Sequence, residues 1–252
     1  MFNMNGGMGG SPKRSLYNPF SSRQGYGETH GWANPTMQGA ISLPEKVMGL
    51  TCLLVACAIG GVALGVAGLN TGASGGSLLW FILMFGLVMA TQALASRPAI
   101  GMVFFLAFGV VTGIVIAPLL SVLRASGDEY IVYEALAATA ATTGGITLYA
   151  RTTSRDFSRI GGWLFAALIG VVVAMVIGLF IQSTAFQIFI SAAACVVFSL
   201  FLLYDIQRVT TTGNAPGNAI RLALKIYLDV FNLFLNLLMI LMMTQGGGNS
   251  RR

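Results

Sequence analysis

The stretch that decides the fold is RLALKIYLDVFNLFLNLLMILMMT, residues Arg221–Thr244. Within it, Lys225, Asp229, Asn232 and Asn236 follow one another at i, i+4, i+7 and i+11. This spacing puts the four polar side chains on one face of an α-helix. The other positions are mostly Leu, Ile, Phe, Val and Met, as a helix in lipid requires. Because a polar face is costly against acyl chains, we expect it to face protein or enclosed water.

The polar residues of this face differ in what they predict. Asn232 and Asn236 are explained without a ligand if they form hydrogen bonds to neighbouring helices, and we favour that interpretation. Asp229 is an ionisable group inside an apolar helix, which indicates a functional role. A second apolar run before it, SAAACVVFSLFLLYDIQ, holds one further acid, Asp205.

The composition is that of a membrane protein. Of the 252 residues, 56% are hydrophobic and 9% charged, with a mean hydropathy of +0.79, whereas soluble domains have roughly 25% charged residues. The net charge is +6. Because the basic residues lie between apolar runs, with no basic and aromatic patch, they indicate membrane topology and not a nucleic-acid partner. The bilayer is therefore the first partner that the sequence predicts.

Seven apolar segments have about the 20 residues needed to cross a bilayer. Runs of this kind can only be helices in lipid, and their short connections favour antiparallel neighbours. We expect an all-α membrane protein, a bundle of seven transmembrane helices over residues 44–245, and a short tail at 246–252. Residues 1–43, rich in Gly, Asn, Ser and Pro, are predicted to be a disordered extension. The segments are Val47–Leu69, Leu78–Ala95, Ala99–Leu120, Ile131–Ala150, Gly162–Ile181, Phe186–Tyr204 and Ile220–Thr244.

The flanking basic residues predict the orientation. With seven crossings, eleven of the 14 Lys and Arg residues fall on the side of the amino terminus and three on the other. Basic residues concentrate on the cytoplasmic side, so the amino terminus and the extension are predicted to be cytoplasmic.

Small and polar residues predict where helices touch. Gly61 with Gly65, and Gly109 with Gly113, each form a small-xxx-small pair that permits close approach of two backbones. A polar stripe on the fourth segment is explained by hydrogen bonds between helices. It consists of Thr139, Thr142, Thr143 and Thr147.

The two aspartates predict a proton-sensitive site. Asp205 is expected at the end of its helix, and Asp229 about nine residues into the last one, so an antiparallel hairpin could bring them together. Two carboxylates close together in a low dielectric cannot both ionise cheaply and would share a proton. They would also suit Ca²⁺, weakly and transiently, because two acids are an incomplete ligand set. The alternative is that each acid is structural.

The residues needed for hydrolytic chemistry are missing. The glycine motifs of intramembrane aspartyl proteases are absent around both acids, and the single histidine, His30, lies in the extension. Cys52, Cys57 and Cys195 lie in apolar runs without metal-ligand spacing. We therefore expect neither an enzyme nor a cofactor, apart from transient Ca²⁺.

Three stretches resemble the Bax inhibitor-1 family of seven-helix membrane proteins. They are LYDIQ (Leu203–Gln207), LALKIYLDVFNLFLNLL (Leu222–Leu238) and RTTSRDFSRIG after the fourth segment. The resemblance covers Pro44–Thr244 and implies six helices around the seventh. It also implies a pH-sensitive calcium leak in which Asp205 and Asp229 sense protons.

The family also implies an alternative function, which the sequence leaves open. Some members modulate cell death or membrane proteases, and the extension would suit such an interaction protein. In bacterial relatives a base near the inner end of the second helix can pair with the first aspartate, and Arg97 is the nearest base here, displaced by about two residues. Arg97, Lys225, Asn232 and Asn236 are thus candidate latch or pathway residues. A bacterial plasma membrane is the first expectation and an organellar membrane the second.

Overall fold

A computed structural model of the chain describes residues 42–69, 78–181, 183–215 and 217–245. The predicted extension, apart from Ser42 and Leu43, lies outside the described residues, as does the predicted tail at 246–252. The described part contains helices and their connections and no strand.

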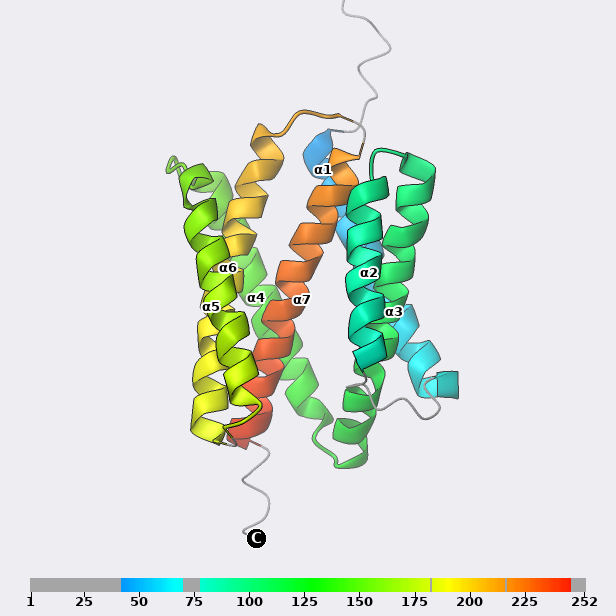
Figure 1. The fold of residues 1–252 in the computed structure, drawn as a ribbon, viewed down its shortest axis with the longest axis vertical. Helices are drawn as coiled ribbons and strands as arrows, with labels where there is room; N and C mark the ends of the chain where they lie inside the picture. The colour runs from blue at the N-terminus through cyan, green and yellow to red at the C-terminus, as the bar shows by residue number, and fades with distance from the viewer. Residues whose placement is uncertain (1–41, 70–77, 182, 216, 246–252) are drawn as a thin grey trace, which may run out of the picture. The chain divides into compact units, whose positions relative to one another are not determined.

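Seven α-helices make up the described part (Figure 1). A π-helical turn, η2, extends the first helix, and a 3₁₀ turn, η3, precedes the fifth. The elements are α1 (Leu43–Leu64), η2 (Gly65–Leu69), α2 (Leu78–Leu94), α3 (Pro98–Ala125), α4 (Glu129–Thr152), η3 (Ser158–Ile160), α5 (Gly161–Gly178), α6 (Thr184–Thr211) and α7 (Asn218–Gln245).

Five helices of the described part are long and apolar enough to cross a membrane. They contain the spans Leu43–Ala67, Pro98–Ala125, Gly161–Gly178, Thr184–Thr211 and Asn218–Gln245. Helices α2 and α4 fall outside this set. The apolar part of α2 that qualifies, Ile82–Leu94, is shorter, and α4 carries the threonine stripe that lowers its hydropathy.

The last two helices extend beyond the predicted segments. Helix α6 was expected to end at Tyr204 but continues to Thr211, and α7 begins at Asn218, two residues before the predicted start. The loss of apolar residues after Tyr204 marks the end of the apolar run in the sequence and not the end of the helix. Arg208 in the last turn of α6 stabilises this extension, because a cation interacts favourably with a helix C-terminus.

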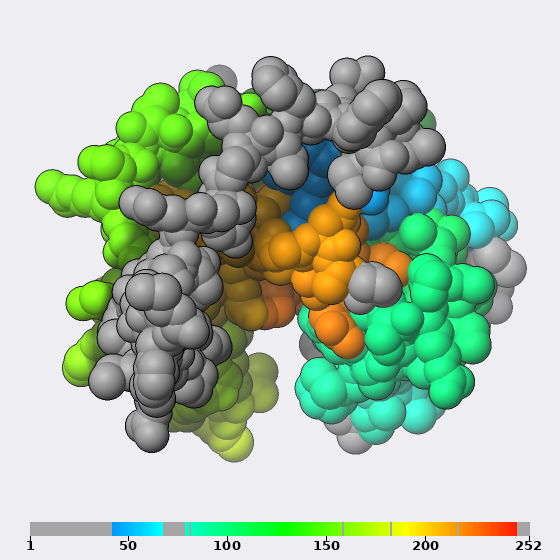
Figure 2. All heavy atoms as spheres, turned by 90° about the horizontal axis from the view of Figure 1, so that it is seen from above, coloured from blue at the N-terminus to red at the C-terminus, as the bar shows by residue number. Residues whose placement is uncertain are grey.

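Helix α7 packs against five neighbours, α1, α2, α3, α4 and α6. Figure 1 shows it in orange and red, with α6 on one side and α2 and α3 on the other. Seen from above in Figure 2, the orange chain near the start of α7 lies between the green segments and the teal segments. Helix α5 instead packs against α6 and η3, so within the described residues the seventh helix is not contacted by all six others.

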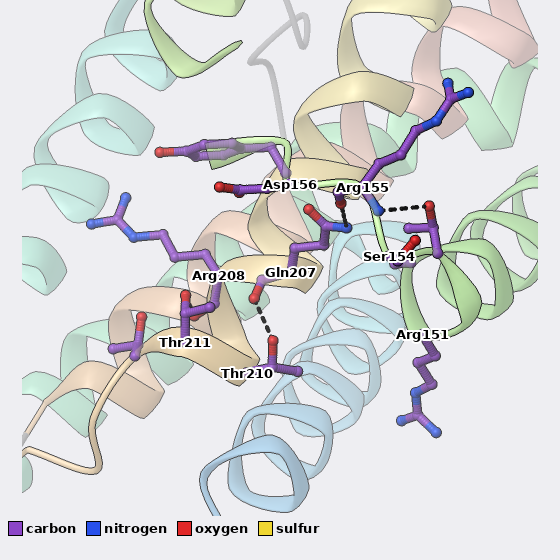
Figure 3. A pocket seen from close by; sticks show the side chains of 12 residues that line it. Arg151, Ser154, Arg155, Asp156, Gln207, Arg208, Thr210 and Thr211 are labelled. Carbon is purple, nitrogen blue, oxygen red and sulfur yellow. Dashed lines mark hydrogen bonds between the residues drawn. The ribbon is translucent and has the colours of Figure 1, made fainter. Parts of the chain in front are cut away.

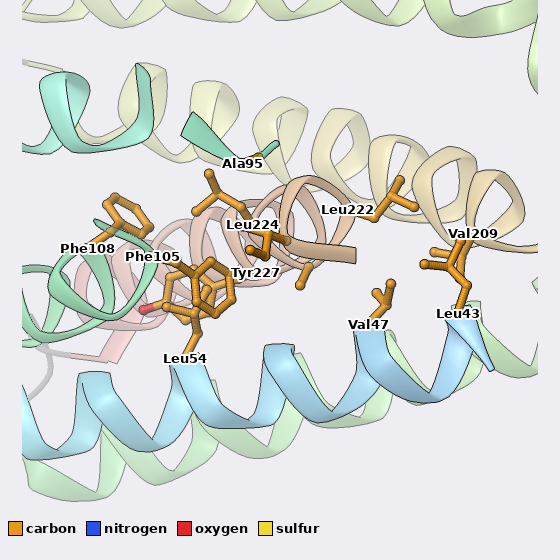
Figure 4. Packing of buried hydrophobic residues seen from close by; sticks show 12 residues of the cluster. Leu43, Val47, Leu54, Ala95, Phe105, Phe108, Val209, Leu222, Leu224 and Tyr227 are labelled. Carbon is orange, nitrogen blue, oxygen red and sulfur yellow. The ribbon is translucent and has the colours of Figure 1, made fainter. Parts of the chain in front are cut away.

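Two apolar clusters surround α7 at successive levels. The first joins α7 to α1 and α3 (Figure 4), with Phe108 edge-on to Tyr227 at a ring-centroid distance of 5.9 Å. The second surrounds the half of α7 nearer its C-terminal end, and includes Ile116, Ile131 and Phe234. The polar face of α7 is therefore set within a largely apolar bundle.

Helices α1 and α3 approach each other through glycine. A Cβ atom at Gly61 would collide with the carbonyl oxygen of Val110, and one at Gly113 with the carbonyl oxygen of Ala58. The close approach predicted from the small-xxx-small pairs is confirmed.

Candidate functional site

Asp205 and Asp229 lie on adjacent, extensively packed helices, α6 and α7. Both are buried, with 4% and 7% of their surfaces exposed. The negative charge of Asp205 acts on Asp229, so the two carboxyl groups lie within electrostatic range of each other. The structure thus brings together the two acids singled out in the sequence.

Their positions along the helices differ from the expectation. Asp205 does not end its helix, because α6 continues for six more residues to Thr211. Asp229 lies eleven residues after Asn218, the first residue of α7, or about 16 Å along the axis at about 1.5 Å per residue. The pair is consequently enclosed between two continuous helices and is not at a helix end.

Two cations act on the pair. Lys225 is half-buried one turn before Asp229, and its charge acts on both carboxylates. Arg208, three residues after Asp205 on α6, acts on Asp205. Sequence reasoning missed Arg208, although the i, i+3 spacing in DIQR was a usable signal, since such residues are neighbours on a helix.

One carboxylate oxygen of the pair lacks a partner. Oδ2 of Asp229 is buried and accepts no hydrogen bond from any described residue. An unsatisfied buried acceptor costs about 1–3 kcal/mol, and more when it is charged. The bundle therefore holds Asp229 under an electrostatic penalty that a proton, a cation or a rearrangement of helices would relieve.

The amides of the polar face bond within their own helix. Asn232 Nδ2 donates to the Leu228 carbonyl and Asn236 Nδ2 donates to the Asn232 carbonyl, both at 2.8 Å. The same holds on α4, where the hydroxyls of Thr139 and Thr147 donate to carbonyls four residues earlier. These amides and hydroxyls were expected to form hydrogen bonds between helices. They donate instead to backbone carbonyls of their own helices.

Arg97 lies apart from the charges that act on the pair. It immediately precedes α3, its side chain is exposed, and its backbone N–H donates to the Leu94 carbonyl at 2.9 Å. The cations acting on Asp205 are Lys225 and Arg208. A latch between Arg97 and the first aspartate therefore stays a prediction.

The donor set of the described residues is incomplete for a resident metal ion. Within the described ranges, no three His, Cys, Asp or Glu side chains gather as a metal site. Asp205 and Asp229 supply two carboxylates, whereas Ca²⁺ takes six to eight oxygen ligands.

Gln207, two residues after Asp205, joins α6 to the loop between α4 and α5. Its Oε1 accepts a hydrogen bond from the Phe157 N–H at 3.1 Å, and its Nε2 donates to the Arg155 carbonyl at 3.0 Å. Two of the three sequence signatures, LYDIQ and RTTSRDFSRIG, therefore meet in space. The sequence alone did not predict this contact, because a glutamine near a membrane surface has many possible partners.

The architecture and the three signatures agree with one family. Residues 43–246 match the family described as "Inhibitor of apoptosis-promoting Bax1". The chain belongs to the Bax inhibitor-1 family. Like its relatives, this Bax inhibitor-1 family member is a multi-pass integral membrane protein, because five of its helices are long and apolar enough to span a bilayer.

Relatives of the chain occur in bacteria and in a virus. An uncharacterized protein of Helicobacter pylori strain J99 is 34% identical over 64% of this chain and 67% of its own length. "Modulator of FtsH protease YccA" of Escherichia coli K12 is 30% identical over 67% of this chain and 75% of its own length. A "Golgi anti-apoptotic protein" of vaccinia virus strain Lister is 28% identical over 78% of this chain and 83% of its own length.

Proposed function

We propose that this Bax inhibitor-1 family protein is a pH-sensitive cation leak, conducting Ca²⁺, in which Asp205 and Asp229 control opening. The observation that carries the proposal is the unpartnered buried oxygen of Asp229 beside a second buried acid. Protonation removes the charge from such a pair and changes the balance between helix packings. Ca²⁺ would occupy the two carboxylates briefly in passing, since a weak incomplete site permits release.

The proposal includes seven crossings arranged around α7. Helices α2 and α4 would cross together with the five apolar spans, and both pack against α7 in support of this arrangement. Lys225 and the amides of Asn232 and Asn236 would then continue the polar face beside the acids. The bacterial plasma membrane is the proposed location, in line with the bacterial relatives.

The amino terminus is proposed to be cytoplasmic, together with the loop between α4 and α5. The distribution of Lys and Arg, eleven against three, supports this orientation. In a variant without the native cysteines, Ser154→Cys should resist an impermeant thiol reagent in intact cells, while Ser126→Cys on the opposite side should react. The reverse labelling pattern would refute the orientation.

The test of the leak is ion flux into liposomes that contain the purified full chain, measured against pH. Replacement of Asp205 or Asp229 by Asn keeps the side-chain shape and removes the shared proton. Each replacement should flatten the pH dependence, and the double replacement should add little, since coupled sites are not additive. Wild-type pH profiles in both single variants would rule out gating by the aspartates.

A second candidate function is that of an interaction protein that modulates a membrane protease. The observation in its favour is the relative whose name is "Modulator of FtsH protease YccA", of which this chain matches 75%. The two functions respond differently to removal of residues 1–43. A leak formed by the helices should survive the deletion, whereas protease modulation through the extension should not. Absence of flux at every pH, together with altered protease activity on co-reconstitution, would favour the second function.

A further inference from the structure

A basic hollow lies between the ends of α4 and α6 (Figure 3). Its volume is about 700 Å³, and it is lined by the last turn of α4, the following loop and the last turns of α6. Most of the residues lining it are polar or charged, which is the composition expected where a membrane helix meets the bilayer surface. It is separate from Asp229, which is within the bundle.

Three arginines border the hollow from two sides. Arg151 and Arg155 belong to the end of α4 and the loop, and Arg208 belongs to α6. Figure 3 shows Arg208 on one side of Gln207 and the other two arginines on the opposite side. All three are exposed, and their guanidinium groups form no hydrogen bond or contact ion pair with a described residue. Their hydrogen-bonding capacity is therefore available to a ligand.

The two sides of the hollow are fixed to each other. Gln207 of α6 holds both the Arg155 carbonyl and the Phe157 N–H, and the Arg155 N–H donates to Thr153 Oγ1 at 3.3 Å. The loop that carries Arg155 is consequently tied to the helix that carries Arg208. This arrangement is preorganised, so binding would order the arginine side chains and not the backbone.

The chemistry of the hollow selects a phosphate of low charge. Guanidinium groups form paired hydrogen bonds with phosphate oxygens, and basic pockets between transmembrane helices bind lipid head groups. However, α4 and α6 both end here, which adds partial negative charge, and Asp156 is on the rim. A multiply charged nucleotide would meet these negative groups, whereas a phosphodiester carries one charge. The apolar surfaces of Ala150 and the Tyr204 ring also suit the first carbons of the lipid acyl chains.

We propose that this hollow is a binding site for the phosphodiester head group of an anionic membrane lipid, held between Arg208 on one side and Arg151 and Arg155 on the other. The site would retain one lipid in place against exchange with the bilayer. It is independent of whether the protein conducts ions.

The test is retention of phosphatidylglycerol by the purified full-length protein, measured by native mass spectrometry against phosphatidylcholine. Arg151→Gln, Arg155→Gln and Arg208→Gln should each weaken binding about fivefold, since one arginine at a membrane surface contributes about 1 kcal/mol. The triple variant should lose on the order of a hundredfold. The matched control is Arg159→Gln, because Arg159 is exposed near the same loop but does not line the hollow.

Three further measurements keep the test decisive. The melting temperature of each variant shows whether it is folded, and the triple Arg→Lys variant keeps the charge but loses the paired geometry, so it should bind at an intermediate level. Equal loss in Arg159→Gln and Arg155→Gln would refute the site and indicate diffuse surface charge. Displacement of phosphatidylglycerol by equimolar ATP or inorganic phosphate would also refute it, in favour of a soluble ligand.

Discussion

The α1–α3 and α6–α7 interfaces are built on opposite principles. Between α1 and α3, Gly61 and Gly113 place the backbones in direct contact, with no room for even a Cβ atom. Between α6 and α7, the packing encloses Asp205 and Asp229, and one oxygen of Asp229 receives no hydrogen bond from the described residues. Both pairs are among the most closely associated helices of the bundle.

The difference separates a fixed interface from one whose energy depends on its charge. The backbone contact between α1 and α3 involves no titratable group. Its energy is therefore the same at any pH. The α6–α7 pair changes by one or more charges in a low dielectric when its carboxylates are titrated. Any movement driven by protons should therefore begin at α6–α7 and leave α1–α3 intact.

The largest effect is expected where the constant interface is broken. Gly61→Leu forces α1 and α3 apart and should lower the free energy of unfolding by about 3 kcal/mol or more, the upper range for overpacking. The matched control is Gly60→Leu, because a Cβ at Gly60 would meet no atom of the described residues within 4 Å. Thermal unfolding in detergent compares the two. Equal melting temperatures would mean that the glycine contact is not what holds these helices together.

The sequence predicted this constant interface better than the charged one. Small residues spaced four apart on a helix indicate where two helices approach closely. The contact at Gly61 and Gly113 could therefore be predicted without a structure. Helical periodicity also placed Lys225 and Asp229 on one face. By contrast, the length of α6 beyond Tyr204 was missed, because hydropathy reports the membrane and not the helix.

Contacts across the bundle were the least predictable part of the site. Arg97 was chosen as a partner for Asp205 by family resemblance, whereas the cations that act on Asp205 are Lys225 on α7 and Arg208 on α6. The amides and hydroxyls expected to bridge helices bond to carbonyls four residues earlier. A polar side chain can often choose between an acceptor in its own helix and one in a neighbouring helix. The choice depends on the rotamer and on the distance between the helices, and residue spacing predicts neither.

The second prediction concerns Lys225, the cation whose charge acts on both acids. Lys225→Met should lower the free energy of unfolding by about 1–2 kcal/mol at pH 8, because two buried carboxylates lose a nearby positive charge. The loss should shrink as the pH is lowered from 8 towards 5, because protonation of a carboxylate removes the charge that the lysine compensates. Melting temperatures at the two pH values measure this.

Lys225→Arg is the control for that change, since it keeps the charge and the approximate length of the side chain. It should retain most of the stability at both pH values. If Lys225→Met and Lys225→Arg lose the same stability at pH 8, the lysine acts through packing and not through its charge.

The third prediction concerns the joint between α6 and its neighbouring loop. Gln207→Leu removes two hydrogen bonds, each contributing about 1 kcal/mol, so the loop at Arg155 should open more often while the bundle remains folded. Trypsin cleavage after Arg155 should accelerate about fivefold or more for each kcal/mol lost. Gln187→Leu, elsewhere on α6, should leave the cleavage rate unchanged. The same acceleration in both variants would indicate a general loosening of α6.

The smallest effect is expected at the amides that continue the polar face of α7. Asn232 and Asn236 donate to carbonyls of α7 that already belong to its helical ladder, so their removal leaves no backbone group unsatisfied. Leucine also has a higher helix propensity than asparagine. Asn232→Leu and Asn236→Leu should therefore each change the free energy of unfolding by less than about 1 kcal/mol, comparable with average polar contacts between membrane helices.

The measurement is thermal unfolding in detergent, with ion flux against pH in liposomes as the second readout. A loss above about 2 kcal/mol in stability would mean that the amide oxygens bond across to another helix. Unchanged stability with reduced flux would instead place the amides on the ion pathway, and would extend the charge-dependent region from the aspartates along α7.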